Sequence, residues 1–194
     1  TKYNTYKETG ETLEDFRREN VNDVVSGVKE EVDAHNLAES KDIRFGISPF
    51  GVWKVGGTDG ANIGPASQSY SGQFADSKKW VDEGWVHYIN PQIYWDFNHS
   101  IAPYADTVDW GVETVRGTDV DLVIGHGIYK TGVSVNEYYE QLKYNQKYPE
   151  IKGSVMYSAN YLDTSQMNVI KNNAWTTTPL QTWSVHNVNL HLSE

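Results

Sequence analysis

Short apolar runs and longer amphipathic stretches alternate along the chain. Apolar runs of strand length begin near residues 43, 86, 121 and 153. Amphipathic stretches, with apolar residues at three- and four-residue steps, cover 12–36, 74–83, 101–116, 134–146 and 164–171. Successive runs begin roughly 32 to 43 residues apart, which leaves room for a crossover helix between parallel strands. The pattern predicts a helix followed by four strand–helix units in one parallel sheet.

The segments between these elements are predicted to be loops, and the last of them marks a predicted domain boundary. Residues 1–11 show no periodicity and are predicted to form a loop. The glycine-rich loop 49–71 is longer than about 15 residues, a length that is usually functional or disordered, and it lacks the spacing of phosphate-binding loops. After residue 175 the alternation ends. We therefore expect one unit at 1–175 and a tail, or the lead-in to a following domain, at 176–194.

Composition narrows the classes of partner. A net charge of -10 with 16 Lys and Arg residues argues against nucleic acid, which leaves neutral ligands or cationic surfaces. The chain has no cysteine and no apolar run of membrane-spanning length. Its 7 Trp and 13 Tyr outnumber its 5 Phe, and rings with a donor group favour surfaces that stack sugars. His186 and His191 are too few for a metal site, and we expect no metal or cofactor.

Four strand–helix units form either an open sheet or half of an eight-unit barrel. An open sheet concentrates its site at one switch point, whereas a barrel collects residues from every strand end. Here all four predicted strands end in polar or aromatic side chains, namely Ser48, Trp53, Asn90, Gln92, Tyr94, Trp95, His126, Tyr129, Ser158 and Asn160. We therefore predict an α/β chain of parallel (β/α) repeats that forms half of a (β/α)8 TIM-type barrel.

Four segments resemble the glycosyl hydrolase-like 10 family: FRRENVN (16–22), FGISPFGVW (45–53), ADSKKWVDEGWVHYINPQIYW (75–95) and GHGIY (125–129). The resemblance covers about residues 12–162, and GISPFG with NPQIYW is its most specific pair of motifs. It implies a TIM-type barrel of which this chain holds the C-terminal half, about strands 5 to 8. It also implies a bacterial glycosidase that is exported or attached to the cell surface. The family's Asp-rich fourth strand end would lie upstream of Thr1.

Glycoside hydrolysis requires two carboxyl groups. Asp96 is the acidic residue at a predicted strand end, whereas the acidic residues of 76–83 fall on a helix and are predicted to be surface charges. Asp96 is therefore the candidate acid or base, and its partner would come from elsewhere. Arg17, near the start of the first long helix, is either a solvated charge or an orienting residue for an upstream carboxylate.

The remaining strand-end residues divide into two predicted roles. Stacking on sugar rings is assigned to Trp53, Tyr94, Trp95 and Tyr129. Hydrogen bonds to sugar hydroxyls are assigned to Asn90, Gln92, His126, Ser158 and Asn160. Alternatives stand beside these roles: the aromatic residues can cap the barrel core, and Asn90 can satisfy the backbone of the turn at Pro91. His126 is either a packed neutral imidazole or a donor that faces the ligand.

The sequence thus predicts the carbohydrate-binding cleft of an extracellular or surface-bound bacterial glycosidase that acts on a cell-wall or other polysaccharide. This chain alone is expected to be inactive. The alternative is a carbohydrate-binding or scaffold module without catalysis. Half a barrel leaves strand edges and an apolar inner face uncovered. We therefore expect either the upstream half of the same barrel or self-association to cover them.

Overall fold

The computed structural model describes residues 2–130 and 134–174. Its helices, in chain order, are α1 (Lys2–Tyr6), α2 (Leu13–Glu39), α3 (Ser69–Gly72), α4 (Ser77–Asp82), α5 (Tyr104–Val115), α6 (Val135–Asn145), η1 (Ala159–Tyr161, a 3-10 helix), α7 (Thr164–Val169) and η2 (Ile170–Ala174, a π-helix). α1 corrects the prediction of a loop, because Tyr3 packs edge-on against Phe16 at a centroid distance of 5.6 Å. The predicted tail at 176–194 lies outside the described residues, so the division into two units stays a prediction.

Four parallel strands form one sheet in the order β1 (Gly46–Ile47), β2 (Tyr88–Ile89), β3 (Asp121–Gly127) and β4 (Ile151–Tyr157). The predicted α/β chain with a parallel sheet is confirmed, and the arrangement is consistent with part of a TIM-type barrel. β1 and β2 begin slightly after the predicted starts near residues 43 and 86. Each ends two residues before a proline, Pro49 or Pro91, which lacks the backbone N–H that a ladder needs. Isolated bridges that link residue 50 to residue 92 and residue 92 to residue 125 continue the pairing beyond both prolines.

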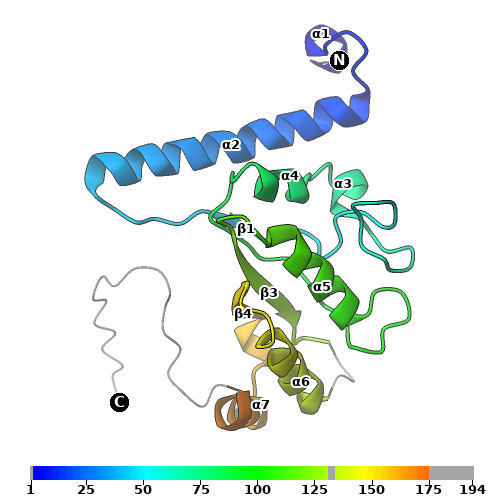
Figure 1. The fold of residues 1–194 in the computed structure, drawn as a ribbon, viewed down its shortest axis with the longest axis vertical. Helices are drawn as coiled ribbons and strands as arrows, with labels where there is room; N and C mark the ends of the chain where they lie inside the picture. Colours follow the sequence, from blue (N-terminus) through cyan, green and yellow to red (C-terminus); the bar gives the residue numbers. More distant parts are fainter. Residues whose placement is uncertain (1, 131–133, 175–194) are drawn as a thin grey trace.

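A layer of helices covers one face of the sheet. α5 packs against β3 and lies between α4 and α6, and α2 crosses α4 at one end of the molecule (Figure 1). Leu122 and Ile124 of β3 belong to the buried cluster beneath α5. α2 contributes a single buried stripe, Arg18, Asn22 and Val25, spaced by about one helical turn. Each helix therefore packs against the sheet or its neighbours through one face, as its amphipathic pattern predicts.

The opposite face of the sheet, here called the inner face, is built around two glycines of β3. A Cβ atom on Gly125 would lie 2.7 Å from Asn90 Oδ1. One on Gly127 would lie 2.8 Å from Tyr94 Cγ. Asn90 and Tyr94 therefore extend from the end of β2 across β3 only because β3 has no side chain at these positions.

Apolar side chains are exposed at both ends of the sheet. Val155 and Tyr157, on the inner side of β4, are 45% and 56% exposed. Val24 and Val28 of α2 are exposed beside a groove of about 470 Å³. An incomplete barrel would leave such surfaces uncovered, and the assignment to its C-terminal half stays a prediction. No helix within 2–130 or 134–174 is long and apolar enough to cross a membrane.

Gly127→Ala should destabilise the fold, because the added Cβ would overlap the Tyr94 side chain while β3 is held by its ladder to β4. We expect the free energy of unfolding to fall by about 1–3 kcal/mol in urea titrations. Gly27→Ala on α2 is the matched control, since nothing lies within 4 Å of its added Cβ and alanine favours a helix. Equal stability of Gly127→Ala and the parent chain would show that Tyr94 does not cover β3.

Candidate functional site

Four tyrosines, here called the tyrosine group, gather at the carboxyl ends of β2, β3 and β4: Tyr94, Tyr129, Tyr157 and Tyr161. The rings of Tyr94 and Tyr157 are parallel to within 13° at a centroid distance of 6.0 Å. Tyr129 stands nearly perpendicular to both, at 5.9 Å and 6.1 Å, and Tyr161 lies 6.1 Å from Tyr129. Tyr129, Tyr157 and Tyr161 are 39%, 56% and 54% exposed. The group therefore presents accessible aromatic surface at the strand ends.

The hydroxyls of the tyrosine group have no hydrogen-bond partner in the described part of the chain. Tyrosines packed between helices differ, since Tyr144 and Tyr148 both donate to Asp109 Oδ1 at 2.7 Å. Burial raises the pKa of Tyr94, so its hydroxyl stays protonated at neutral pH. Both rings and hydroxyl donors of the tyrosine group are thus available to a polar ligand.

Asp96 lies in the turn between β2 and α5, two residues after Tyr94. Its backbone carbonyl accepts hydrogen bonds from the amides of His99 at 3.3 Å and Tyr104 at 3.1 Å. Its side chain is half-buried, and the carboxylate has no hydrogen bond or ion pair to any residue of 2–130 or 134–174. The structure therefore places an unpaired carboxylate in the turn that follows β2, two residues after Tyr94 of the tyrosine group.

His126 lies on the helix-facing side of β3, opposite to the tyrosine group. It is fully buried, and its Nδ1 lies 2.9 Å from Gln141 Oε1 while its Nε2 lies 3.1 Å from Ser154 Oγ. An amide oxygen only accepts, so Nδ1 carries the proton and Nε2 accepts from the hydroxyl. Burial lowers the pKa of His126 to about 4, which keeps the ring neutral at pH 7. These surroundings are those of a packed imidazole, and contact with a ligand stays a prediction.

Trp53 lies within the packing of the long loop and makes none of its ring contacts with the tyrosine group. It is 7% exposed and stacks on Trp110 at a centroid distance of 6.0 Å. Its Nε1 donates to Asp76 Oδ1 at 2.8 Å. Asp76 is therefore a half-buried acceptor, which corrects the prediction of a surface charge. Stacking of Trp53 on a sugar stays a prediction.

Three more predicted contact residues lie along the end of β2. Asn90 is 7% exposed and lies over β3. Gln92 donates to the Ser48 carbonyl at 2.8 Å, which joins the ends of β1 and β2. Trp95 is half-buried and tilted against His99 at a centroid distance of 5.9 Å. Of these, Gln92 and Trp95 retain accessible surface for a ligand.

The end of β4 holds two predicted contact residues, Ser158 and Asn160, and two tyrosines. Ser158 is half-buried and precedes η1, in which Asn160 is exposed. Tyr157 and Tyr161, which complete the tyrosine group, were not predicted. The period-two alternation of β4 was the available signal for Tyr157, because it puts Val155 and Tyr157 on the same face of the strand.

The two arginines at the start of α2 have different surroundings. Arg17 is exposed, and its guanidinium lies 4.9 Å from the centroid of the Phe74 ring. Arg18 is the arginine that turns inward: it pairs with Asp15 at 2.7 Å and donates to the Tyr70 carbonyl at 3.2 Å. The inward position of Arg18 was not predicted, and contact of Arg17 with an upstream carboxylate stays a prediction.

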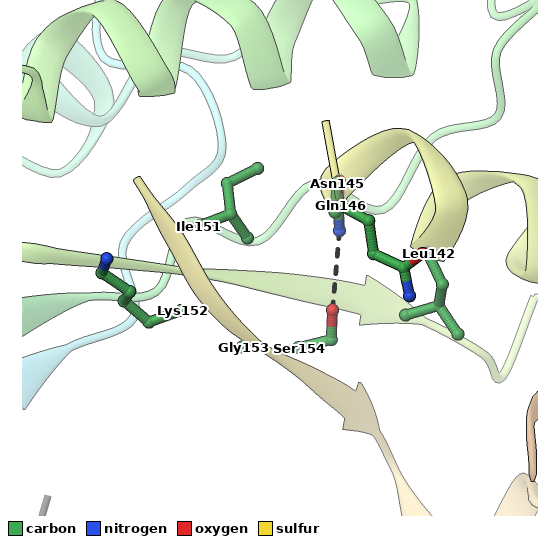
Figure 2. A pocket seen from close by; sticks show the side chains of 7 residues that line it. All are labelled: Leu142, Asn145, Gln146, Ile151, Lys152, Gly153 and Ser154. Carbon is green, nitrogen blue, oxygen red and sulfur yellow. Dashed lines mark hydrogen bonds between the residues drawn. The ribbon is translucent and has the colours of Figure 1, made fainter. Parts of the chain in front are cut away.

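A cavity of about 330 Å³ lies between α6 and β4, on the helix-facing side of the sheet. Figure 2 shows the end of α6 facing the first half of β4 across it. Its polar groups have protein partners, since Asn145 donates to Ser154 Oγ at 3.5 Å and Lys152 donates to the Pro149 carbonyl at 2.7 Å. We assign no ligand to this cavity. Within the described ranges, no group of three or more His, Asp or Glu side chains could hold a metal ion.

Comparison with known proteins gives consistent matches over most of the chain. Residues 1–142 match the family described as Glycosyl hydrolase-like 10. Glycosyl hydrolase YngK of Bacillus subtilis (strain 168) is 32% identical over 172 residues, which cover 84% of this chain and 33% of that protein. Glycosyl hydrolase DigH of Escherichia coli (strain K12) is 33% identical over 167 residues, which cover 78% of this chain and 37% of that protein. The chain thus spans about a third of the length of these relatives.

Acidification should destabilise the protein through His126. In the unfolded chain His126 binds a proton near the ordinary pKa of 6.5. In the folded protein burial lowers the pKa of His126 to about 4, so the folded state binds this proton only at a lower pH. The free energy of unfolding should therefore begin to fall as the pH drops below 6.5, and this contribution should reach about 3 kcal/mol below pH 4. Urea titrations over this range measure the slope. His126→Gln cannot take up the proton and should show a shallower decline; an equally steep one would contradict the assignment.

Proposed function

Because the chain belongs to the glycosyl hydrolase-like 10 family, we propose that it forms the carbohydrate-binding cleft of a glycosidase that hydrolyses O-glycosidic bonds in a polysaccharide. The tyrosine group carries this proposal, since rings with unengaged hydroxyls converge where parallel strands end. Barrel enzymes hold their substrates at this edge. We place the four strands as the fifth to eighth of a (β/α)8 barrel, and a bacterial cell-wall glycan is the substrate that we favour.

The tyrosine group suits a neutral sugar. A pyranose ring has an apolar face of C–H groups, which packs on an aromatic ring, and hydroxyls, which pair with phenolic hydroxyls. The net charge of -10 opposes the approach of an anionic polymer. Gln92 and Trp95 add an amide and a further ring at the end of β2. The ligand would therefore lie across the ends of β2, β3 and β4.

Hydrolysis needs a second carboxyl group about 5 Å from Asp96 for retention of configuration, or about 6.5–9.5 Å for inversion. Glu137 lies in the first turn of α6, but its Oε1 already accepts hydrogen bonds from the Phe97 amide at 2.9 Å and from Gln141 at 3.0 Å. We therefore place the partner of Asp96 upstream of this chain, with Arg17 as its candidate orienting residue. On this proposal the chain alone is inactive and the longer protein is the enzyme.

A carbohydrate-binding module without catalysis is the second candidate. The unpaired Asp96 carboxylate favours it, because one carboxylate beside a cluster of rings can bind a sugar hydroxyl without cleaving a bond. This candidate keeps the same ligand class and the same residues of the tyrosine group. It differs in requiring no catalytic partner for Asp96.

We also propose an extracellular or cell-surface location, because a polysaccharide is too large to reach an enzyme inside the cell. The relatives from Bacillus subtilis and Escherichia coli support a bacterial source.

The proposed partner is the upstream half of the same barrel, and self-association of this chain is the alternative. Either would cover the exposed Val155 and Tyr157 of β4 and the groove on α2.

The deciding experiment compares this chain with a version extended upstream by four strands. Each is incubated with bacterial wall glycans and plant polysaccharides, and the products are identified by mass spectrometry. We expect cleavage by the extended protein alone, and its loss on combining Gln92→Ala with Trp95→Ala. Cleavage by the short chain would place the catalytic pair within these residues. Binding without cleavage by either protein would favour the non-catalytic module.

Removing the exposed rings should weaken binding of neutral oligosaccharides. Tyr157→Ala and Tyr161→Ala should each raise Kd by about two- to tenfold, because an aromatic contact contributes about 0.5–1.5 kcal/mol. Isothermal titration calorimetry measures the affinity. Tyr6→Ala is the matched control, because Tyr6 is 71% exposed and lies on α1. An affinity unchanged in the two β4 variants would exclude the tyrosine group as the binding surface.

A further inference from the structure

We propose that Glu137 and Gln141 of α6 are positioning residues that fix the direction of the Asp96 carboxylate at the strand ends. This inference rests on the proposed function, because it concerns the one strand-end carboxylate assigned to it. The contacts themselves are independent of that function. They join the turn at 95–97 to α6, and through α6 to β3 and β4.

The peptide groups on both sides of Asp96 are held by α6. The carbonyl of Trp95 accepts a hydrogen bond from Gln141 Nε2 at 3.0 Å. The amide of Phe97 donates to Glu137 Oε1 at 2.9 Å. Gln141 Nε2 also donates to Glu137 Oε1 at 3.0 Å, so the two side chains act as one clamp. A residue whose preceding carbonyl and following amide are both fixed has little freedom to turn about its own backbone.

The carbonyl of Asp96 is held from a second direction by α5. It accepts hydrogen bonds from the amides of Tyr104 and His99, and Tyr104 is the first residue of α5. The two peptide groups that flank Asp96 therefore have assigned partners on two helices, α5 and α6. The carboxylate of Asp96 makes no hydrogen bond to a residue of the described ranges, so it is left to meet a ligand.

The orientation of the Gln141 amide is fixed, because its neighbours allow only one assignment of donors and acceptors. Trp95 and Glu137 offer only acceptor oxygens to Gln141, so its amide nitrogen must face them and its Oε1 must face His126. His126 therefore donates from Nδ1, and the Ser154 hydroxyl donates to Nε2. The side chains of Gln141 and His126 are 2% and 0% exposed, so breaking one bond would leave a buried polar atom unsatisfied. The chain of bonds is thus held as a unit.

This arrangement combines a fixed backbone with an unengaged carboxylate. A structural aspartate would be expected to use its oxygens in ion pairs or side-chain hydrogen bonds, as Asp15 does with Arg18 and Asp76 does with Trp53. A group that exchanges a proton with a bound sugar must instead keep its oxygens open and its direction fixed. Misplacement of a reacting group by about 1 Å can lower a rate by about a hundredfold. Loosening the clamp should therefore lower turnover more than affinity.

The test uses Glu137→Ala and Glu137→Asp, with Glu137→Gln as the conservative variant. Alanine removes the acceptor for the Phe97 amide and aspartate withdraws it by one methylene, whereas glutamine keeps an oxygen within reach. We expect hydrogen exchange at the Phe97 amide of this chain to become at least about tenfold faster with alanine and aspartate and to be largely restored with glutamine. In the protein extended upstream, kcat for glycan cleavage should fall about ten- to hundredfold while KM changes little.

Glu140→Ala, an exposed position on the same helix, is the matched control and should change neither readout. Asp96→Asn should lower kcat without accelerating exchange at Phe97. Unchanged exchange at Phe97 in Glu137→Ala and Glu137→Asp would overturn the clamp. Faster exchange with unchanged kcat would overturn its role in positioning. If the parent extended protein cleaves no glycan, the proposed function fails, whereas the exchange measurement still decides whether the clamp exists.

Discussion

Side chains from the end of β2 lie across β3, and the absence of side chains on β3 is what makes this possible. Asn90 and Tyr94 occupy the space that Cβ atoms on Gly125 and Gly127 would fill. Tyr94 thereby comes within ring contact of Tyr129, which follows β3, and of Tyr157, which ends β4. The steric freedom of two glycines thus brings together rings that are far apart in the sequence, and the rest of the tyrosine group follows from the parallel order of the strands.

The order and spacing of the helices and strands could be predicted, because each connection between parallel strands needs enough residues for a helix. The strand lengths were harder, because Pro49 and Pro91 interrupt runs whose apolar character continues through them. α1 was missed because its contacts are made by a few side chains: Tyr3 packs on Phe16 and donates to the Glu11 carbonyl. A helix of five residues is too short to show a repeating pattern of apolar positions.

A candidate site at the strand ends could be predicted from the sequence, whereas the residues that gather there were harder to predict. Parallel strands bring their carboxyl ends to one edge, which is enough to group Tyr94 with Tyr129. Burial depends on neighbours that are distant in sequence, so the stacking of Trp53 on Trp110 left no local signal. For His126, the flanking glycines conceal which side of the strand carries the apolar face. No local pattern marks the role of Glu137, because its bond to the Phe97 amide joins residues that lie 40 positions apart.

The opposite placement of His126 and Tyr94 on the two sides of the sheet has a consequence for how such a protein can diverge. On the helix-facing side, each buried polar side chain has a fixed donor or acceptor role toward its neighbour. A substitution of one of them alone would leave a buried partner without its hydrogen bond. Tyr129, Tyr157 and Tyr161 are exposed and have unengaged hydroxyls, so each can be exchanged alone. On the proposed function, mutation and selection could change the choice of glycan one aromatic residue at a time, while the hydrogen bonds around Asp96 stay unchanged.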